Sequence, residues 1–158
     1  MKEIVDVTKS FGAITAIIEY KNKPVEILHF PNTILEKGRE MLAKVLAGQY
    51  DNTIFVQNML FGDGGIDQQE KKRTVTTDRN SLFGVTRAKK FVVAQIDPTT
   101  KTQAIFTTVI AFEEANGYYL SEMALQLNNE DIFSMATFPS LGKTDQMQIT
   151  WNWRLSFV

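Results

Sequence analysis

Two aspartates, Asp63 and Asp67, flank a pair of glycines in a segment that otherwise has the composition of a turn. Carboxylate oxygens at this spacing could join a calcium site. However, no glutamate closes a twelve-residue loop from Asp63, and the stretch lacks the lysine and hydroxyl of a phosphate-binding loop. We therefore expect Gly64 and Gly65 to form a tight turn that needs a positive φ, and no metal site.

His29 is the only histidine, and it lies in a strand-like run between two apolar residues. A Ser-His-Asp catalyst could use such a residue, but the glycine pattern of a nucleophile elbow is missing. One histidine cannot build a zinc site of two or three histidines, and a chain without cysteine has no thiolate site. The sequence therefore predicts a non-enzymatic protein with no catalytic residue, cofactor or metal.

Glu122 alternates along the chain with Leu120 and Ala124, which places a carboxylate among apolar neighbours. A buried carboxylate usually has a cationic partner. We expect a structural ion pair with Arg154, and Lys143 is the alternative partner.

Basic residues are concentrated between positions 71 and 90, and three nearby acidic residues, Asp67, Glu70 and Asp78, partly offset them. Such a segment is either a solvated loop and strand edge or a surface for an acidic partner. The residues that we expect to contact a partner are Asp63, Lys71, Lys72, Arg73 and Arg79.

The elements that must position these residues are mostly strands. Residues 13–20 and 25–30 are rich in β-branched residues and flank a turn signal at 21–24, which predicts a hairpin. Thr33 and Glu36 have the spacing of a capping box, and apolar residues then recur at helical spacing as far as Gly48. We therefore expect one amphipathic helix over about 33–47, with Gly38 in close contact with another backbone.

A strand over 53–61 leads into a long polar loop at about 62–81, and four further strands are expected at 82–97, 103–115, 118–127 and 132–138. The Asn116-Gly117 pair predicts a hairpin between the second and third of these. From Met147 to Phe157, large apolar residues alternate strictly with polar ones, which is typical of a strand with one buried face. Trp151 and Trp153 lie on the apolar side, so we expect them in the core.

Composition limits the range of partners. The chain has 158 residues, 17 basic against 18 acidic residues, and no run of about 20 apolar residues that a membrane span would need. The near balance of charge makes nucleic acid an unexpected partner. No signal-peptide core follows Met1. We expect a single mainly β (α+β) domain, residues 1–158, folded as an antiparallel β-sandwich with one helix packed on it.

The ordered pattern from about Asn32 to the C-terminus resembles small virion domains of tailed phages, found in tail-fibre attachment regions, baseplates, collars and head decorations. The matching segments are the helix that starts near Asn32, the stretches 61–65 and 80–83, the strand 117–125, the stretch 132–139 with Lys143-Thr144, and the last strand 149–157. The chain departs from the pattern at Ala124, where related domains often have glycine.

The resemblance implies a structural subunit of the tail, baseplate or collar that is made in the host cytoplasm and ends in the virion. It implies other virion proteins as partners and a homo-oligomer, for example a trimer or hexamer. One alternative is a head-decoration (cement) protein. Another is a carbohydrate-binding module for host recognition, which would need solvent-exposed aromatics such as Tyr118 and Tyr119.

Overall fold

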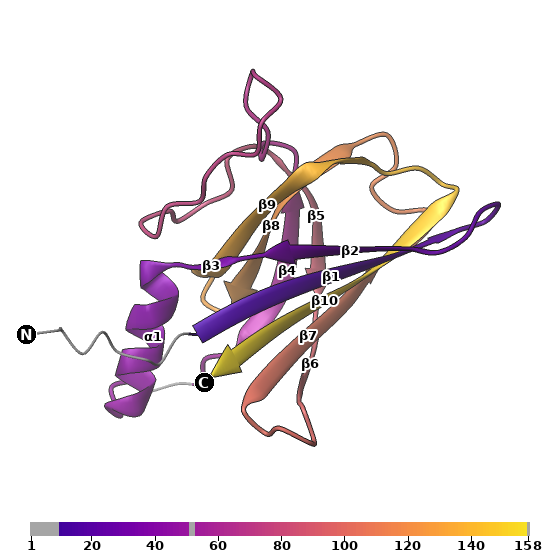
Figure 1. The fold of residues 1–158 in the computed structure, drawn as a ribbon. Coiled ribbons are helices and arrows are strands. Elements are labelled where there is room, and N and C mark those ends of the chain that lie inside the picture. Colours follow the sequence, from indigo (N-terminus) through magenta and orange to yellow (C-terminus); the bar gives the residue numbers. More distant parts are fainter. Residues whose placement is uncertain (1–9, 51–52, 158) are drawn as a thin grey trace, which may run out of the picture.

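The computed structural model describes residues 10–50 and 53–157 (Figure 1). Ten strands form two antiparallel sheets of five, and one helix lies at the end of the sandwich. The predicted mainly β sandwich with one helix is therefore confirmed. Among the described residues, no helix is long and apolar enough to cross a membrane.

The first sheet, sheet A, has the order β2-β1-β10-β7-β6. Its strands are β1 (Ser10–Tyr20), β2 (Glu26–Pro31), β6 (Val93–Ile96), β7 (Gln103–Ile110) and β10 (Met147–Phe157). The second sheet, sheet B, has the order β3-β9-β8-β4-β5. Its strands are β3 (Thr33–Ile34), β4 (Val56–Gly62), β5 (Thr86–Phe91), β8 (Tyr119–Leu127) and β9 (Ile132–Gly142).

The chain passes directly from one sheet to the other at both edges of the sandwich. Asn32 separates β2 from β3 at one edge, and Val92 separates β5 from β6 at the other. The prediction of one strand over 82–97 is therefore wrong. Val92 N–H still bonds to the carbonyl of Gln57 of β4 in sheet B, and from Val93 the chain pairs with β7 in sheet A. Residues 82–85 belong to the loop before β5.

The Asn116-Gly117 turn also differs from the prediction. It joins β7 of sheet A to β8 of sheet B, so it connects the layers and is not a hairpin. Gly117 has a positive φ of 88°, as the turn signal requires, but residues 111–118 are too long and irregular to align the flanking strands. The hairpin β1–β2 is as expected, and β6–β7 and β8–β9 also form hairpins.

The helix α1 (Glu36–Leu46) begins three residues later than predicted. Thr33 and Ile34 pair with Met135 and Ser134 of β9 as strand β3, so Thr33 is not the cap. Leu35 occupies the cap position and makes no side-chain capping bond. The helix ends before Gly48, as the sequence predicts. Gly48 has a φ of 68°, and its N–H donates a hydrogen bond to the carbonyl of Val45.

Close packing of α1 on β9 depends on Gly38. A Cβ at this position would lie 2.5 Å from the carbonyl oxygen of Phe133. The close backbone approach expected from the sequence is therefore present, and it explains why a residue with poor helix propensity stands in the helix.

The last strand, β10, has the predicted bounds and the predicted alternation. Its inward residues are buried from Met147 to Leu155, and Trp151 and Trp153 are fully buried. Trp151 packs against Phe61 of β4 and Phe138 of β9, with ring centroids 5.0 and 5.4 Å apart. These aromatic contacts join the inner faces of the two sheets.

Candidate functional site

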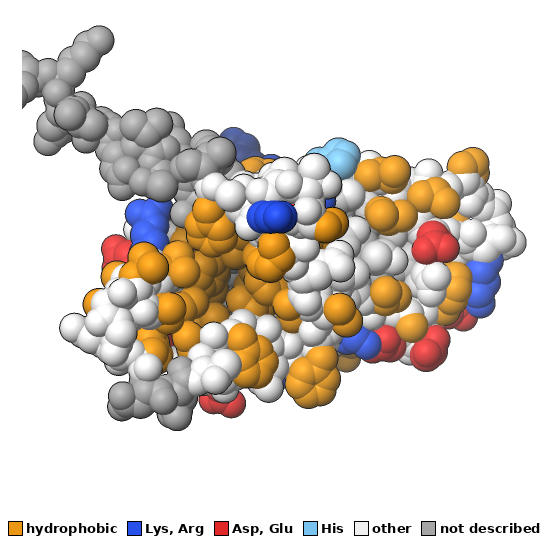
Figure 2. Space-filling model, turned by 90° about the horizontal axis from the view of Figure 1, so that it is seen from below, with side chains coloured by type: hydrophobic (Ala, Val, Ile, Leu, Met, Phe, Trp, Pro, Cys, Tyr) orange, Lys and Arg blue, Asp and Glu red, His pale blue; other side chains and the backbone are white. Residues whose placement is uncertain are grey.

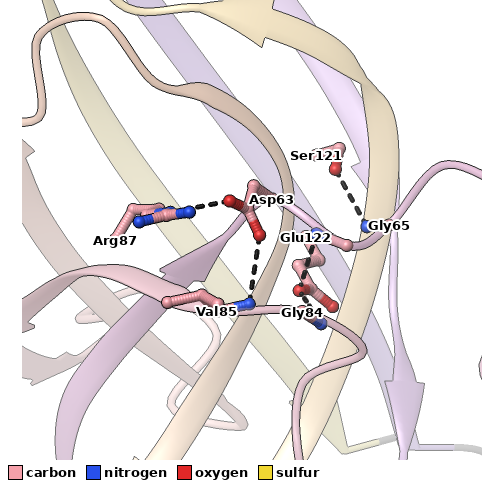
Figure 3. Close-up of polar contacts among 8 residues, drawn as sticks. Asp63, Gly65, Gly84, Val85, Arg87, Ser121 and Glu122 are labelled. Carbon is pink, nitrogen blue, oxygen red and sulfur yellow. Dashed lines mark hydrogen bonds and ion pairs between the residues drawn. The ribbon is translucent and has the colours of Figure 1, made fainter.

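The long loop between β4 and β5 is held against β8 by one buried carboxylate. Glu122 is fully buried on β8, and its oxygens accept hydrogen bonds from three backbone N–H groups of the loop, of which Figure 3 shows two, one of them from Gly84. Oε1 accepts from Gly64 at 3.0 Å and Gly84 at 2.8 Å, and Oε2 accepts from Phe83 at 2.7 Å. Two stretches of loop nearly twenty residues apart are thereby fixed to one side chain.

The expected ion pair between Glu122 and Arg154 is wrong. Arg154 lies on the outer side of β10 and pairs with Asp97 at 2.9 Å, whereas Glu122 is on the other sheet and uses backbone amides. Lys143, the alternative partner, is buried and donates to the carbonyls of Phe112 and Thr144 and to Asn116. The sequence indicated that Glu122 is buried but gave no sign of its donors.

The sequence predicts that Gly64 and Gly65 adopt a positive φ, and this prediction is wrong. Both glycines are needed because other backbone atoms lie close to them. The only described glycines with positive φ are Gly48 and Gly117. A Cβ on Gly64 would lie 2.2 Å from the nitrogen of Gly84, and a Cβ on Gly65 would lie 2.0 Å from the carbonyl oxygen of Ser121. The loop therefore packs backbone to backbone at this point.

Asp63 and Asp67 have separate partners. Asp63 accepts hydrogen bonds from Val85 N–H and from Arg87, whose Nε lies 2.6 Å from its Oδ2 (Figure 3). Asp67 accepts from the N–H groups of Gln69 and Lys71. Within the described residues, no group of three acidic or histidine side chains could hold a metal ion.

The predicted partner-contact residues fall into two groups. Asp63, Arg73 and Arg79 are used inside the loop: Arg73 donates to the carbonyl of Gly64, and Arg79 donates to the carbonyls of Ser81 and Leu82. Lys71 and Lys72 are exposed and make no ion pair among the described residues. They lie on a small finger, residues 66–72, closed by a bridge between Ile66 and Lys72.

This finger and the β7–β8 connection border an open hollow with a volume of about 960 Å³. Tyr118 and Tyr119 lie at its wall and are 41% and 68% exposed. The residues that line it are Asp63, Ile66, Glu70, Lys71, Lys72, Gly117, Tyr118, Tyr119, Ser121, Pro139 and Ser140. The structure thus brings three of the expected contact residues, Asp63, Lys71 and Lys72, together with both tyrosines, although they come from distant parts of the chain.

Three ion pairs give the fold an expected dependence on pH. Burial alone would raise the pKa of Asp63, but hydrogen bonds from Arg87 and from Val85 N–H lower it overall below its ordinary value of 3.8. The hydrogen bond from Arg154 lowers the pKa of Asp97. The pKa of Glu114 is lowered in the same way by Lys90.

We expect acid to destabilise the protein through these carboxylates. A carboxyl group whose pKa is lower in the folded state stabilises the fold above its unfolded-state pKa, and this contribution is lost as the pH falls through the folded-state pKa. The free energy of unfolding in urea should therefore fall from about pH 6 to about pH 3. Asp63→Asn should be less stable than the native chain at neutral pH and lose less on acidification, and an equal loss in both proteins would contradict the assignment.

Comparisons with protein-family models, with curated proteins and with solved structures find no match to this chain.

Proposed function

We propose that the chain is a non-enzymatic assembly subunit of a tailed-phage particle, and that it associates with a second copy of itself through the outer face of sheet A. The observation that carries the proposal is the near absence of charge on this face. The resemblance of the sequence to small virion domains supports the location in a particle.

The outer face of sheet A is wide and is not covered by any other described element. The helix contacts β9 of sheet B, and the long loop packs on β8. The outward residues alternate with buried ones, and neutral hydrogen bonds such as Thr107 to Asn152 link neighbouring strands. The outward residues of sheet A are Ile27, His29 and Pro31 of β2; Ala13, Thr15, Ile17 and Glu19 of β1; Gln148, Thr150, Asn152, Arg154 and Ser156 of β10; Gln103, Ile105, Thr107 and Val109 of β7; and Val93 and Gln95 of β6.

Glu19 and Arg154 are the only charged residues in this set, whereas 22% of the whole chain is charged. A sheet face that is meant to stay in water usually carries more charge than this, and interface centres are depleted in charged residues. The single histidine also lies here, 3.2 Å from Thr15, which gives it a place in a strand pair and not in a catalytic cluster.

The two charges are placed so that two copies complement each other. Glu19 is opposite Gln148, and Arg154 is opposite Ala13, so the charges lie near opposite ends of β1 and β10, about 20 Å apart along the strands. A two-fold axis in the plane of the interface, perpendicular to the strands, brings Glu19 of each copy toward Arg154 of the other, and Arg154 also keeps Asp97 of its own chain as a partner. Such an isologous contact also lets sheets stack with nearly aligned strands.

The size of the face is adequate. Four spacings between five strands span about 19 Å, and the eleven residues of β1 and β10 span about 36 Å, so the face measures roughly 700 Å² in projection. A stable interface of standard size buries about 800 Å² on each partner.

Like charges at the centre of this face should prevent association. Ile17 and Thr150 lie opposite each other on β1 and β10, close to the proposed axis. Replacing both with glutamate brings four carboxylates together in the dimer, and we expect association to weaken by about 100-fold or more, because juxtaposed like charges cost several kcal/mol. Sedimentation velocity over a concentration series measures the effect.

The matched control is the double change Ile17→Gln and Thr150→Gln, which alters volume in the same way without charge. Gln49→Glu adds one negative charge on an exposed residue beyond α1. Both should associate like the native chain. A native chain that stays monomeric at its highest soluble concentration would overturn the proposed contact. Absence of the chain from purified particles, measured by mass spectrometry, would overturn the virion assignment separately.

A further inference from the structure

We propose that the hollow between the finger and the two tyrosines, defined above, binds an acidic oligosaccharide. This inference goes beyond assembly, because the hollow is formed by sheet B, the finger and the β7–β8 connection, and not by the outer face of sheet A.

The two tyrosine rings are exposed but held in place. A Cβ on Gly142 would lie 3.1 Å from Cε1 of Tyr119, so the glycine leaves room for the ring to lie along β9. The guanidinium of Arg87 lies 4.6 Å from the centroid of Tyr118 and is itself fixed by Asp63. Binding therefore requires little ordering of these rings, which favours affinity.

The frame around the rings is also rigid. Ser121, which lines the hollow, accepts a hydrogen bond from Gly65 N–H at 2.9 Å (Figure 3), and the adjacent Glu122 holds the loop through three more amides. Pre-formed concave sites with a few convergent polar groups are typical of ligand pockets, and a volume of about 960 Å³ lies at the upper end of their usual range.

The chemistry of the lining selects the class of ligand. Exposed tyrosine rings offer flat apolar faces with a polar hydroxyl, which suits the C–H face of a sugar ring and its hydroxyl groups. Lys71 and Lys72 add two exposed cations at the rim. The one carboxylate there that makes no ion pair with another described residue is that of Glu70, because Asp63 is paired with Arg87. A sugar chain that carries carboxylates therefore fits better than a neutral one.

A protein or nucleic-acid occupant fits less well. Hydrophobic side chains do reach the surface elsewhere, including Phe91, Val93 and Ile96 near the β5–β6 corner, and Figure 2 shows hydrophobic side chains around a hollow on the side seen from below. The hollow beside the tyrosines differs from these areas because it combines exposed rings with cations and hydroxyls. A single strand of nucleic acid would need a basic groove that follows its backbone, whereas this rim carries two lysines beside a glutamate.

The test uses matched sugars with the full chain. Sialyllactose and trigalacturonic acid are the acidic probes, and lactose and maltotriose are the neutral ones, with binding followed by NMR chemical shifts and calorimetry. We expect the acidic probes to shift the resonances of Tyr118 and Tyr119. Tyr119→Ala should weaken binding by about tenfold or more, whereas Tyr119→Phe, which keeps the ring, should stay within about threefold.

The double change Lys71→Ala and Lys72→Ala should remove the preference for the acidic over the neutral sugar, and Phe91→Ala, an equally exposed ring outside the hollow, should change nothing. Binding that is indifferent to Tyr119→Ala, or no shifts with any probe, would overturn the proposal. Tighter binding of an acidic peptide or of oligothymidylate at the same tyrosines would also overturn it. None of these variants lies on the outer face of sheet A, so the oligomeric state is tested independently.

Discussion

Replacing Glu122 with glutamine is expected to lower the free energy of unfolding by about 3 kcal/mol, measured by urea denaturation. The native carboxylate is fully buried, and its two oxygens accept three backbone N–H groups. Glutamine keeps the shape but replaces one oxygen with an NH₂ group, which cannot accept. At least one loop amide then loses its acceptor and faces a donor, in a place that water does not reach.

The size of the loss follows from the kind of hydrogen bond. A buried hydrogen bond to a charged group contributes about 1.5–3 kcal/mol, and a buried donor left without a partner costs about 1–3 kcal/mol. Glu122→Ala removes all three acceptor contacts and leaves a cavity, so we expect about 4 kcal/mol or more. Glu113→Gln is the matched control on an exposed residue, and it should stay within about 0.5 kcal/mol of the native chain.

Hydrogen exchange distinguishes this mechanism from a general loss of stability. In Glu122→Gln the amides of Gly64, Phe83 and Gly84 should lose more protection than the amides of β10, because local opening of the loop now costs less than global unfolding. An unfolding free energy within about 1 kcal/mol of the native value would contradict the role of this carboxylate. So would unchanged protection of the three amides.

The same residue shows what the sequence could and could not predict about the site. Alternation with Leu120 and Ala124 placed Glu122 on the buried side of a strand, because side chains on a strand follow a period of two. Its partners are backbone N–H groups of residues about forty and sixty positions earlier, and an N–H leaves no mark in a sequence. The sequence predicts an ion pair with Arg154 because the charge of a side chain can be read from a sequence, whereas the position of a backbone N–H cannot.

The fold was predictable where a local pattern decides the structure. The period of two in β10 and the glycine after α1 both describe what the residues do within one element, and both are confirmed. The errors occur at the corners, where Val92 and the Asn116-Gly117 turn carry the chain between the two sheets. A corner and a hairpin use the same turn residues, and only the pairing of distant strands decides between them.

The tyrosine hollow could not be found from spacing. Lys71 and Lys72 precede Tyr118 and Tyr119 by more than forty residues, and they line the same hollow because Glu122 and Ser121 hold the loop on β8. The signal in the sequence was indirect. Both tryptophans fall on the apolar face of β10, so they are not available to a ligand. The neighbouring residues Tyr118 and Tyr119 remained as the aromatic candidates.

Replacing Trp151 with alanine is expected to lower the free energy of unfolding by about 4 kcal/mol, because large-to-small changes in a core lose both contacts and packing volume. Trp151 is fully buried and packs on Phe61 and Phe138, and Phe138 in turn lies 5.1 Å from Phe30 between ring centroids. Its ring therefore joins aromatic side chains of both sheets. Urea denaturation measures the loss.

Trp151→Phe is the control that separates ring packing from the indole nitrogen. The buried Nε1 of Trp151 has no hydrogen-bond partner among the described residues. Burial of an unpaired donor costs free energy, so its removal partly offsets the smaller ring, and we expect Trp151→Phe to cost about 1–2 kcal/mol. A cost equal to that of Trp151→Ala would show that the ring contacts with Phe61 and Phe138 are not what stabilises this part of the core.

The neighbouring residue provides the opposite test, because Thr150 faces outward on the same strand. Thr150→Glu should weaken self-association and leave the unfolding free energy within about 0.5 kcal/mol, whereas Trp151→Ala should lower stability. Under conditions in which the Trp151→Ala variant is still folded, the outer face of sheet A should associate as it does in the native chain. If the two substitutions have the same effect on both measurements, then β10 does not separate an inner structural face from an outer assembly face. In that case the proposed contact between copies loses its basis.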